Sequence, residues 1–263
     1  MKRFIQFEMV INEIFYSLQG EGFLTGVPSV FVRLAGCPLR CRWCDTKYAW
    51  SKDAGDDYSI AEIIQAVQQW PCKFIVITGG EPMINPDLPQ LVQQLNASEK
   101  HITIETAGVA FMPNMPCDLM SISPKLSNST PSAEDRSQKT EIRSLAPTPV
   151  VGARGTEVKS LSRAQSRGQK FLRPDITILR KLIDNYKYQL KFVVDSEGDL
   201  PEIQQTIERI GNVDSEKVML MPQAATRDEL LAKSPMVAEL CKRTGFAFCQ
   251  RLQVLLWNNQ RAT

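Results

Sequence analysis

The sequence predicts an α/β fold, a partial (β/α) barrel of about six parallel strands. Short β-branched and apolar runs alternate along the chain with segments that have the periodicity of amphipathic helices. This alternation is typical of right-handed βαβ units and a parallel sheet. Six strands suit a partial barrel better than a closed one with eight. With 263 residues, of which 43% are hydrophobic, we expect a single domain over residues 1–263.

The expected strands are runs rich in Val, Ile, Leu and Phe. They cover residues 29–34, 73–78, 101–105, 119–123, 188–194 and 217–221. The expected helices cover residues 59–70, a segment opened by Asn85 and Pro86, and residues 178–186, 200–210 and 227–244. Capping boxes, with Ser59 before the first helix and Thr226 before the last, support these starts, and Pro235 is expected to kink or divide the last helix.

Residues 126–173 break the alternation. They are rich in Ser, Thr, Arg and Gln without sustained periodicity, so we expect a flexible insertion outside the catalytic core. The end of this segment is basic through Lys159, Arg163, Arg167, Lys170 and Arg173. A solvated surface is the favoured interpretation, and a nucleic-acid contact is the alternative.

Composition excludes several classes of function. The chain has 31 basic and 29 acidic side chains, a balance that gives no global field for nucleic acid or membranes. No signal-peptide pattern and no apolar stretch of about 20 residues is present, so we expect a cytoplasmic location and no membrane contact. The single histidine, His101, excludes multi-histidine metal sites.

Three of the seven cysteines, Cys37, Cys41 and Cys44, follow the first expected strand at spacings of four and three residues. Thiolates bind zinc or iron–sulfur clusters, but a structural zinc site needs four ligands and no fourth lies nearby in the sequence. Three thiolates on a cubane cluster leave one iron open for chemistry. Zinc, or three unrelated thiols, remains the alternative.

Other polar residues also follow strands, where parallel α/β proteins place their chemistry. Gly79, Gly80 and Glu81 follow the second strand, residues 123–125 the fourth and Gln223 the sixth. The glycine pair permits close approach of the backbone to a ligand, and a simple turn is the alternative.

The C-x3-C-x2-C spacing resembles the radical S-adenosylmethionine (SAM) superfamily. The resemblance implies a [4Fe–4S] cluster on Cys37, Cys41 and Cys44, SAM on the open iron and a 5′-deoxyadenosyl radical. By the same resemblance, the SAM contacts are Trp43, Cys44, Asp45, Gly80, Glu81, Ser123, Pro124, Lys125 and Gln223. A surface cation is the alternative for Lys125, and a capped strand end is the alternative for Gln223.

A narrower resemblance rests on residues 15–22 (FYSLQGEG), Gly26, Arg33 and the Cys44-Asp45-Thr46 run. These residues resemble the 7-carboxy-7-deazaguanine synthase family, best over about residues 11–82 and again near residues 105–108, 123–125 and 191–194. The insertion and the chain beyond about residue 250 depart from the family pattern.

This resemblance implies a carbon–nitrogen lyase of queuosine and 7-deazapurine biosynthesis. It would convert 6-carboxy-5,6,7,8-tetrahydropterin to 7-carboxy-7-deazaguanine with loss of ammonia. Thr46 would bind Mg²⁺, with a turn cap as its alternative role. The implied substrate contacts are Leu18, Gln19, Gly20, Arg33 and Thr78. A guanidinium suits the substrate carboxylate, and a surface ion pair is the alternative for Arg33.

The resemblance also implies a homodimer and a flavodoxin-like or ferredoxin-like electron donor. Two other functions stay open from the sequence. One is an activase of glycyl-radical enzymes, which shares the cysteine spacing. The other is a non-catalytic module that binds an iron–sulfur cluster or zinc.

Overall fold

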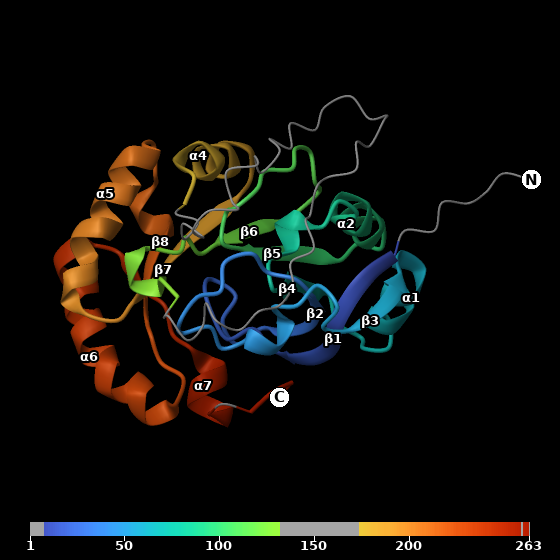
Figure 1. Cartoon of the computed structure of the whole chain (residues 1–263), viewed down its shortest axis with the longest axis horizontal. Coiled ribbons are helices and arrows are strands. Elements are labelled where there is room, and N and C mark those ends of the chain that lie inside the picture. Colours follow the sequence, from blue (N-terminus) through green and yellow to red (C-terminus); the bar gives the residue numbers. More distant parts are fainter. Residues whose placement is uncertain (1–7, 132–173, 259, 263) are drawn as a thin grey trace, which may run out of the picture.

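The computed structural model describes residues 8–131, 174–258 and 260–262. Its centre is a nine-stranded sheet with the order β3-β1-β2-β4-β5-β6-β7-β8-β9. No pairing joins the edge strands β3 and β9 within these ranges, so the sheet is open. Figure 1 shows the strands toward the centre, with helices α1, α2, α4, α5 and α6 around the periphery. This architecture confirms the predicted partial barrel.

The six predicted strands are all present. They are β2 (Pro28–Leu34), β4 (Phe74–Gly79), β5 (His101–Thr106), β6 (Leu119–Ile122), β7 (Tyr188–Val194) and β8 (Val218–Pro222). Each pairs with its neighbour in parallel. Strands covered on both faces have continuous apolar sequences, which is why these six were predictable.

Three further strands were not predicted. β1 (Glu8–Leu18) pairs antiparallel with β2, and β3 (Asp56–Ser59) pairs antiparallel with β1. β1 is only partly buried along much of its length, so polar residues interrupt its apolar pattern. β9 (Ala247–Phe248) has two residues, too few for a recognisable pattern.

Two helices begin where the capping residues predicted. α1 (Ile60–Val67) and α6 (Arg227–Thr244) both start with complete capping boxes, at Ser59 and Thr226. α2 (Leu88–Ala97) starts a few residues later than predicted. The other helices are α4 (Ile176–Asn185), α5 (Leu200–Ile210) and α7 (Leu252–Trp257).

Pro235 does not divide α6, which is continuous from Arg227 to Thr244. A proline removes one backbone donor and leaves the carbonyl four residues earlier without its helical partner. That carbonyl belongs to Leu231, whose side chain is exposed. Water can therefore satisfy the carbonyl, so of the two outcomes expected for Pro235, a kink or a division, the division is wrong.

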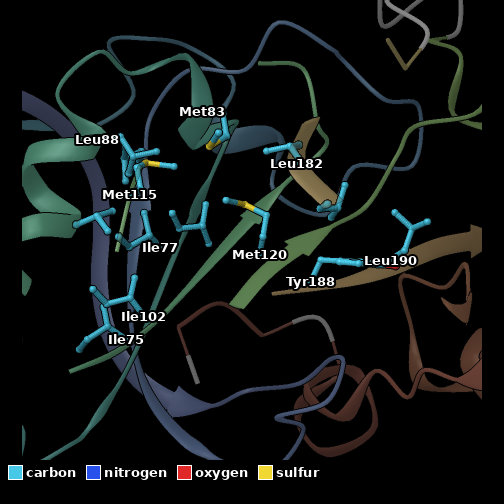
Figure 2. Close-up of a cluster of buried hydrophobic side chains, with 14 of the residues drawn as sticks. Ile75, Ile77, Met83, Leu88, Ile102, Met115, Met120, Leu182, Tyr188 and Leu190 are labelled. Carbon is cyan, nitrogen blue, oxygen red and sulfur yellow. The ribbon is translucent and has the colours of Figure 1, made fainter. Parts of the chain in front are cut away.

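One continuous cluster of buried hydrophobic side chains extends from β1 to α6. Figure 2 shows its central part, where strand residues such as Ile77, Met120 and Leu190 belong to the same cluster as Leu88 of α2 and Leu182 of α4. This core fixes the strands, and thereby the loops at their C-terminal ends. No helix of the described ranges is long and apolar enough to cross a membrane.

The predicted insertion starts too early. Leu126 and Ser129 are buried, and a short 3-10 turn (Ser127–Ser129) lies against the cysteine loop, where the Arg42 amide donates to the Ser129 carbonyl at 3.2 Å. Residues 126–131 are therefore part of the framework of the site. The rest of the predicted insertion, residues 132–173, lies outside the described residues.

Candidate active site

The C-terminal ends of the parallel strands open into a cavity with a volume of about 430 Å³. All predicted site residues line it except Glu81 and Pro124. Those that do are Leu18, Gln19, Gly20, Arg33, Cys37, Cys41, Trp43, Cys44, Asp45, Thr46, Thr78, Gly80, Ser123, Lys125 and Gln223. Residues predicted to bind a cluster, a cofactor and a substrate thus share one space.

The cysteine loop begins directly after β2. Backbone hydrogen bonds hold its base, from the Gly36 amide to the Ala49 carbonyl at 2.9 Å and from the Cys37 amide to the Trp50 carbonyl at 3.1 Å. All seven cysteines are free thiols. Only Cys37, Cys41 and Cys44 among them line the cavity. The set of three thiols therefore fits a cluster with three protein ligands and one open iron.

Burial raises the pKa of the Cys37 thiol to about 12 and also raises that of Cys41. Free thiols of this kind stay protonated at neutral pH and are poor nucleophiles, whereas metal binding displaces the proton. Within the described ranges, no group of three His, Cys, Asp or Glu side chains is arranged to hold a single metal ion.

The Gly79-Gly80 pair allows β4 to contact the cysteine loop. A Cβ atom on Gly79 would lie 2.1 Å from the Leu34 carbonyl oxygen, and one on Gly80 would lie 2.1 Å from the Gly36 oxygen. Gly79 also has a φ of +139°, which side chains rarely adopt. The glycine pair therefore approaches the backbone of the end of β2 and of the cysteine loop, rather than a ligand. This contact holds the cysteine loop in place.

Glu81 is buried behind the cavity lining. Its carboxylate accepts hydrogen bonds from the Thr106 hydroxyl at 2.6 Å and from the amides of Met83 at 3.1 Å and Ala107 at 2.8 Å. Burial raises the pKa of Glu81, and these donors partly offset that effect. The side chain connects the loops after β4 and β5. Neither this carboxylate nor Pro124 lines the cavity.

Thr46 directly follows the last cluster cysteine and occupies the N-cap position of a 3-10 turn (Lys47–Ala49). Its side chain makes no capping hydrogen bond. The Thr46 hydroxyl lies 3.5 Å from the Cys44 sulfur and lines the cavity. The Thr46 hydroxyl therefore does not cap this turn, which was the alternative role considered for Thr46.

Trp43 and Lys125 lie together on one wall. The Lys125 ammonium is 5.5 Å from the centre of the Trp43 ring and donates to the Ser123 hydroxyl at 2.8 Å. The Trp43 indole donates to the Asn128 carbonyl at 3.0 Å. Lys125 is thus a cavity residue and not a surface cation.

Gln223 follows β8 and also lines the cavity. Its side-chain oxygen accepts from the Lys233 ammonium of α6 at 2.7 Å. The same ammonium pairs with Asp195 at 2.5 Å. Gln223 therefore has a polar partner at its strand end as well as access to the cavity.

A row of polar side chains crosses the strands inside the sheet, here called the polar row: Arg33, Thr78, Glu105, Ser121 and Gln189. Arg33 is in register with Thr78, Glu105 with Ser121, and Ser121 with Gln189. Hydrogen bonds connect neighbours, from the Thr78 hydroxyl to Glu105 at 2.9 Å and from the Gln189 amide to Ser121 at 2.8 Å. Four of these five residues, all but Gln189, line the cavity and give it a polar floor.

Arg33 at one end of the polar row has an ion-pair partner. Its Nε lies 2.6 Å from Oε1 of Glu13 on β1, and the two side chains are only 13% and 12% exposed. Burial alone would raise the pKa of Glu13, but Arg33 and Arg261 lower it below its ordinary value. The ion pair proposed as the alternative for Arg33 thus exists, but it is largely buried and borders the cavity.

A second group, here called the buried charge cluster, was not predicted: Glu21, Glu105, Lys191, Arg251 and Gln253. The Lys191 ammonium is 2.9 Å from Glu21 and 3.7 Å from Glu105. Glu21 also accepts from Arg251 at 3.2 Å and from Gln253 at 2.9 Å. Burial disfavours the charge on Lys191, but the two carboxylates outweigh it and raise the pKa of Lys191.

Arg251 extends this cluster to the cysteine loop. Its Nη2 lies 2.5 Å from Asp45, and its Nη1 donates to the Ala224 carbonyl after β8. Burial lowers the pKa of Arg251 by itself, but Asp45 and Glu21 raise it overall. The start of α7 is thus connected to the cysteine loop by a side chain that is only 9% exposed.

Three members of the buried charge cluster carried a signal in the sequence, since Glu21 lies in the FYSLQGEG run and Glu105 at the end of a predicted strand. Lys191 is a cation within an apolar run that forms a fully buried strand, and such a charge requires a partner. Arg251 and Gln253 belong to a short C-terminal helix without a motif, and only the fold brings them to the cavity.

An open, mainly parallel sheet whose cysteine loop and Gly-Gly turn share one cavity defines a radical SAM protein. The model of the Radical SAM superfamily matches residues 32–127. The crystal structure of QueE from Escherichia coli has the same fold, with a TM-score of 0.63 and 23% identity over 92% of this chain and 93% of that one.

The particular family follows from relatives that match nearly the whole chain. The 7-carboxy-7-deazaguanine synthase of Rhodopirellula baltica is 36% identical over 97% of this chain and 89% of its own length. That of Halobacterium salinarum is 38% identical over 96% and 92%, respectively. The chain belongs to the 7-carboxy-7-deazaguanine synthase family. This confirms the resemblance and favours it over a glycyl-radical activase or a non-catalytic module.

Proposed function

We propose that this chain converts 6-carboxy-5,6,7,8-tetrahydropterin to 7-carboxy-7-deazaguanine and ammonia, as a radical SAM carbon–nitrogen lyase of queuosine and 7-deazapurine biosynthesis. The product and ammonia together contain all atoms of the substrate, so the conversion needs no net oxidant. The observation that carries the proposal is the shared cavity, which joins three cluster thiols to buried carboxylates and an arginine.

The residues of the cysteine loop fit the cofactors of the superfamily. Cys37, Cys41 and Cys44 would hold a [4Fe–4S] cluster, and Trp43 and Lys125 would border the SAM position. When bound, the cluster and SAM supply the one-electron chemistry that removes a hydrogen atom from the substrate. The surrounding loops exclude water and fix the orientation of the substrate.

The polar floor suits a pterin. The 2-amino group and ring N–H groups of a pterin are donors, and Glu21 and Glu105 are partly buried acceptors that line the same cavity. Oε1 of Gln253 is buried and has no hydrogen-bond partner among the described residues, which is costly unless a ligand donates to it. Arg33 would bind the substrate carboxylate. Leu18, Gln19, Gly20 and Thr78 border the same space and complete the proposed substrate contacts.

We propose that Thr46 contributes one oxygen to a Mg²⁺ ion. Magnesium prefers oxygen ligands, keeps several waters and takes few ligands from the protein. The Thr46 hydroxyl lines the cavity and caps no helix, which supports this role. The ion would orient the substrate carboxylate and stabilise charge during ring contraction.

A homodimer, a flavodoxin-like or ferredoxin-like electron donor and a cytoplasmic location also belong to the proposal. Their support is the family resemblance and, for the location, the free cysteines of the described chain.

The test is product analysis after anaerobic reconstitution with iron and sulfide. The protein would be incubated with the pterin carboxylate, SAM, Mg²⁺ and dithionite, and the products followed by liquid chromatography and mass spectrometry. We expect 7-carboxy-7-deazaguanine and ammonia in equal amounts, and neither from Cys41→Ala. Reductive SAM cleavage that never yields the deazapurine would contradict the proposed substrate.

A further inference from the structure

Glu13 is shared by two arginines from distant parts of the chain. Its Oε1 is 2.6 Å from Nε of Arg33, and its Oε2 is 2.8 Å from Nε of Arg261. The Tyr48 hydroxyl donates to Oε1 at 3.2 Å. Both carboxylate oxygens are therefore engaged, one by the proposed substrate-binding arginine and the other by a residue near the C-terminus.

Arg261 is held at this position by two further contacts. Its Nη2 donates to Oδ1 of Asn12 at 3.0 Å, and its guanidinium carbon lies 4.0 Å from the centre of the Tyr48 ring. Arg261 lines the cavity, and so do Gln260 and Ala262 beside it. This segment thus forms part of the cavity wall on which Arg33 lies.

The charges on this wall differ from those of the buried charge cluster. Two guanidiniums and the Glu13 carboxylate leave one positive charge in excess on the wall. In the buried charge cluster and its contact with the cysteine loop, by contrast, three carboxylates (Glu21, Asp45 and Glu105) face two cations (Lys191 and Arg251). The wall of Arg33 and Arg261 is therefore the electrostatic match for a substrate carboxylate.

Arg33 contacts Glu13 through Nε, one edge of its planar guanidinium. The other edge, formed by Nη1 and Nη2, can bind a second carboxylate bidentately. Without Arg261, Arg33 alone would compensate the negative charge of Glu13. The pair would then have no net positive charge to attract an incoming anion. With Arg261 present, the wall keeps its positive excess.

We propose that Arg261 is a specificity-determining residue: it neutralises Glu13 so that Arg33 selects pterins that carry a carboxylate. This inference rests on the proposed function, since it specifies which group of the substrate the wall recognises. Arg261 acts through Glu13 and Arg33 and is therefore a positioning residue.

The test compares binding of two probes to the reconstituted holoprotein with SAM: 6-carboxy-5,6,7,8-tetrahydropterin, and 5,6,7,8-tetrahydropterin, which lacks the carboxylate. For Arg261→Gln, we expect a weakening of about tenfold for the first probe, from loss of one nearby charge. Binding of the second probe should stay within about twofold. KM should rise more than kcat falls, because the wall binds the ground state and the transition state alike.

Arg243→Gln is the matched control, because Arg243 is similarly exposed and pairs with Glu197 away from the cavity. It should bind both probes like the wild type. Arg261→Lys keeps the charge and should restore most of the selectivity. In a Glu13→Gln background, Arg261→Gln should have a much smaller effect, since there is no carboxylate left to neutralise.

Three outcomes would overturn the inference. They are unchanged affinity for the carboxylated pterin in Arg261→Gln, equal loss for both probes, and an effect that persists in the Glu13→Gln background. Failure of the proposed function looks different, because the wild type itself would then bind neither pterin.

Discussion

Replacing Lys191 with methionine tests whether the buried charge cluster holds the sheet together beneath the active site. Lys191 is 3% exposed, with its ammonium 2.9 Å from Glu21 and 3.7 Å from Glu105. Methionine has a similar length and keeps the apolar contacts of the stem. The substitution therefore removes the charge and leaves two buried carboxylates with one cation fewer.

Removing one partner of a buried ion pair typically costs about 3–5 kcal/mol, because the remaining charge is left uncompensated. Glu21 keeps Arg251 and Gln253, and Glu105 keeps Thr78 and Gln19. We therefore expect the lower end of this range, about 3 kcal/mol. A domain is stable by only about 5–15 kcal/mol, so this is a large fraction of the total.

The assay is anaerobic denaturant unfolding of the metal-free chain near neutral pH, followed by tryptophan fluorescence. The control is Lys242→Met, since Lys242 is 71% exposed and pairs with Glu239 on the surface of α6. The control should change the free energy of unfolding by less than about 0.5 kcal/mol. A loss below about 1 kcal/mol in Lys191→Met would show that the carboxylates do not depend on this cation.

The pH dependence gives a second check. Burial tends to raise the pKa of Glu21, but Lys191 and Arg251 lower it well below its ordinary value of 4.5. A depressed folded-state pKa contributes stability above 4.5, and this contribution is lost as the pH falls below it. In Lys191→Met the depression is smaller, so less stability remains to be lost. The difference in the free energy of unfolding between variant and wild type should therefore become smaller below pH 4.5. A difference that stays constant with pH would contradict this account.

Three further predictions concern the cofactor region. Cys41→Ala should abolish the cluster, and the wild type should bind about four irons per chain by iron assay and EPR; about eight would refute a single cluster. Thr46→Val should leave cluster content and SAM binding intact but lower turnover and weaken its Mg²⁺ dependence; a normal response to Mg²⁺ would remove Thr46 from the metal site. Gly80→Ala would place a carbon 2.1 Å from the Gly36 oxygen, so we expect a displaced cysteine loop and lower iron content after reconstitution.

Much of the fold was predictable because the local sequence signals, apolar runs and capping residues, agree with the burial and helix starts of the folded chain. A strand such as β4 is buried on both faces and therefore reads as an apolar run bounded by a glycine. Ser59 and Thr226 cap their helices through short-range contacts that the sequence contains in full. β1 lacked such agreement, because its partly buried pattern reflects pairing with β2 and β3.

Parts of the site were predictable for a topological reason. Loops that leave the C-terminal ends of parallel strands meet at one edge of the sheet, so the cysteine loop, the Gly79-Gly80 turn and residues 123–125 had to converge. The contacts within the site depend instead on register and on distant segments. Arg251 lies 206 residues from Asp45 and Arg261 lies 248 residues from Glu13, and no local pattern specifies such pairs.

The buried charge cluster is hard to explain as a device for stability. Replacing buried ion pairs with apolar residues of similar volume is often neutral or stabilising, so a sheet selected only to fold would not need Lys191 and Glu105 at its centre. These groups border the cavity, and Oε1 of Gln253 is buried there with no hydrogen-bond partner among the described residues. The buried charge cluster thus offers carboxylate and amide acceptors to the cavity, while Arg33 and Arg261 give the wall a positive excess. A ligand that offers ring N–H donors to the buried charge cluster and a carboxylate to the wall satisfies both, and a carboxylated pterin has this distribution of groups.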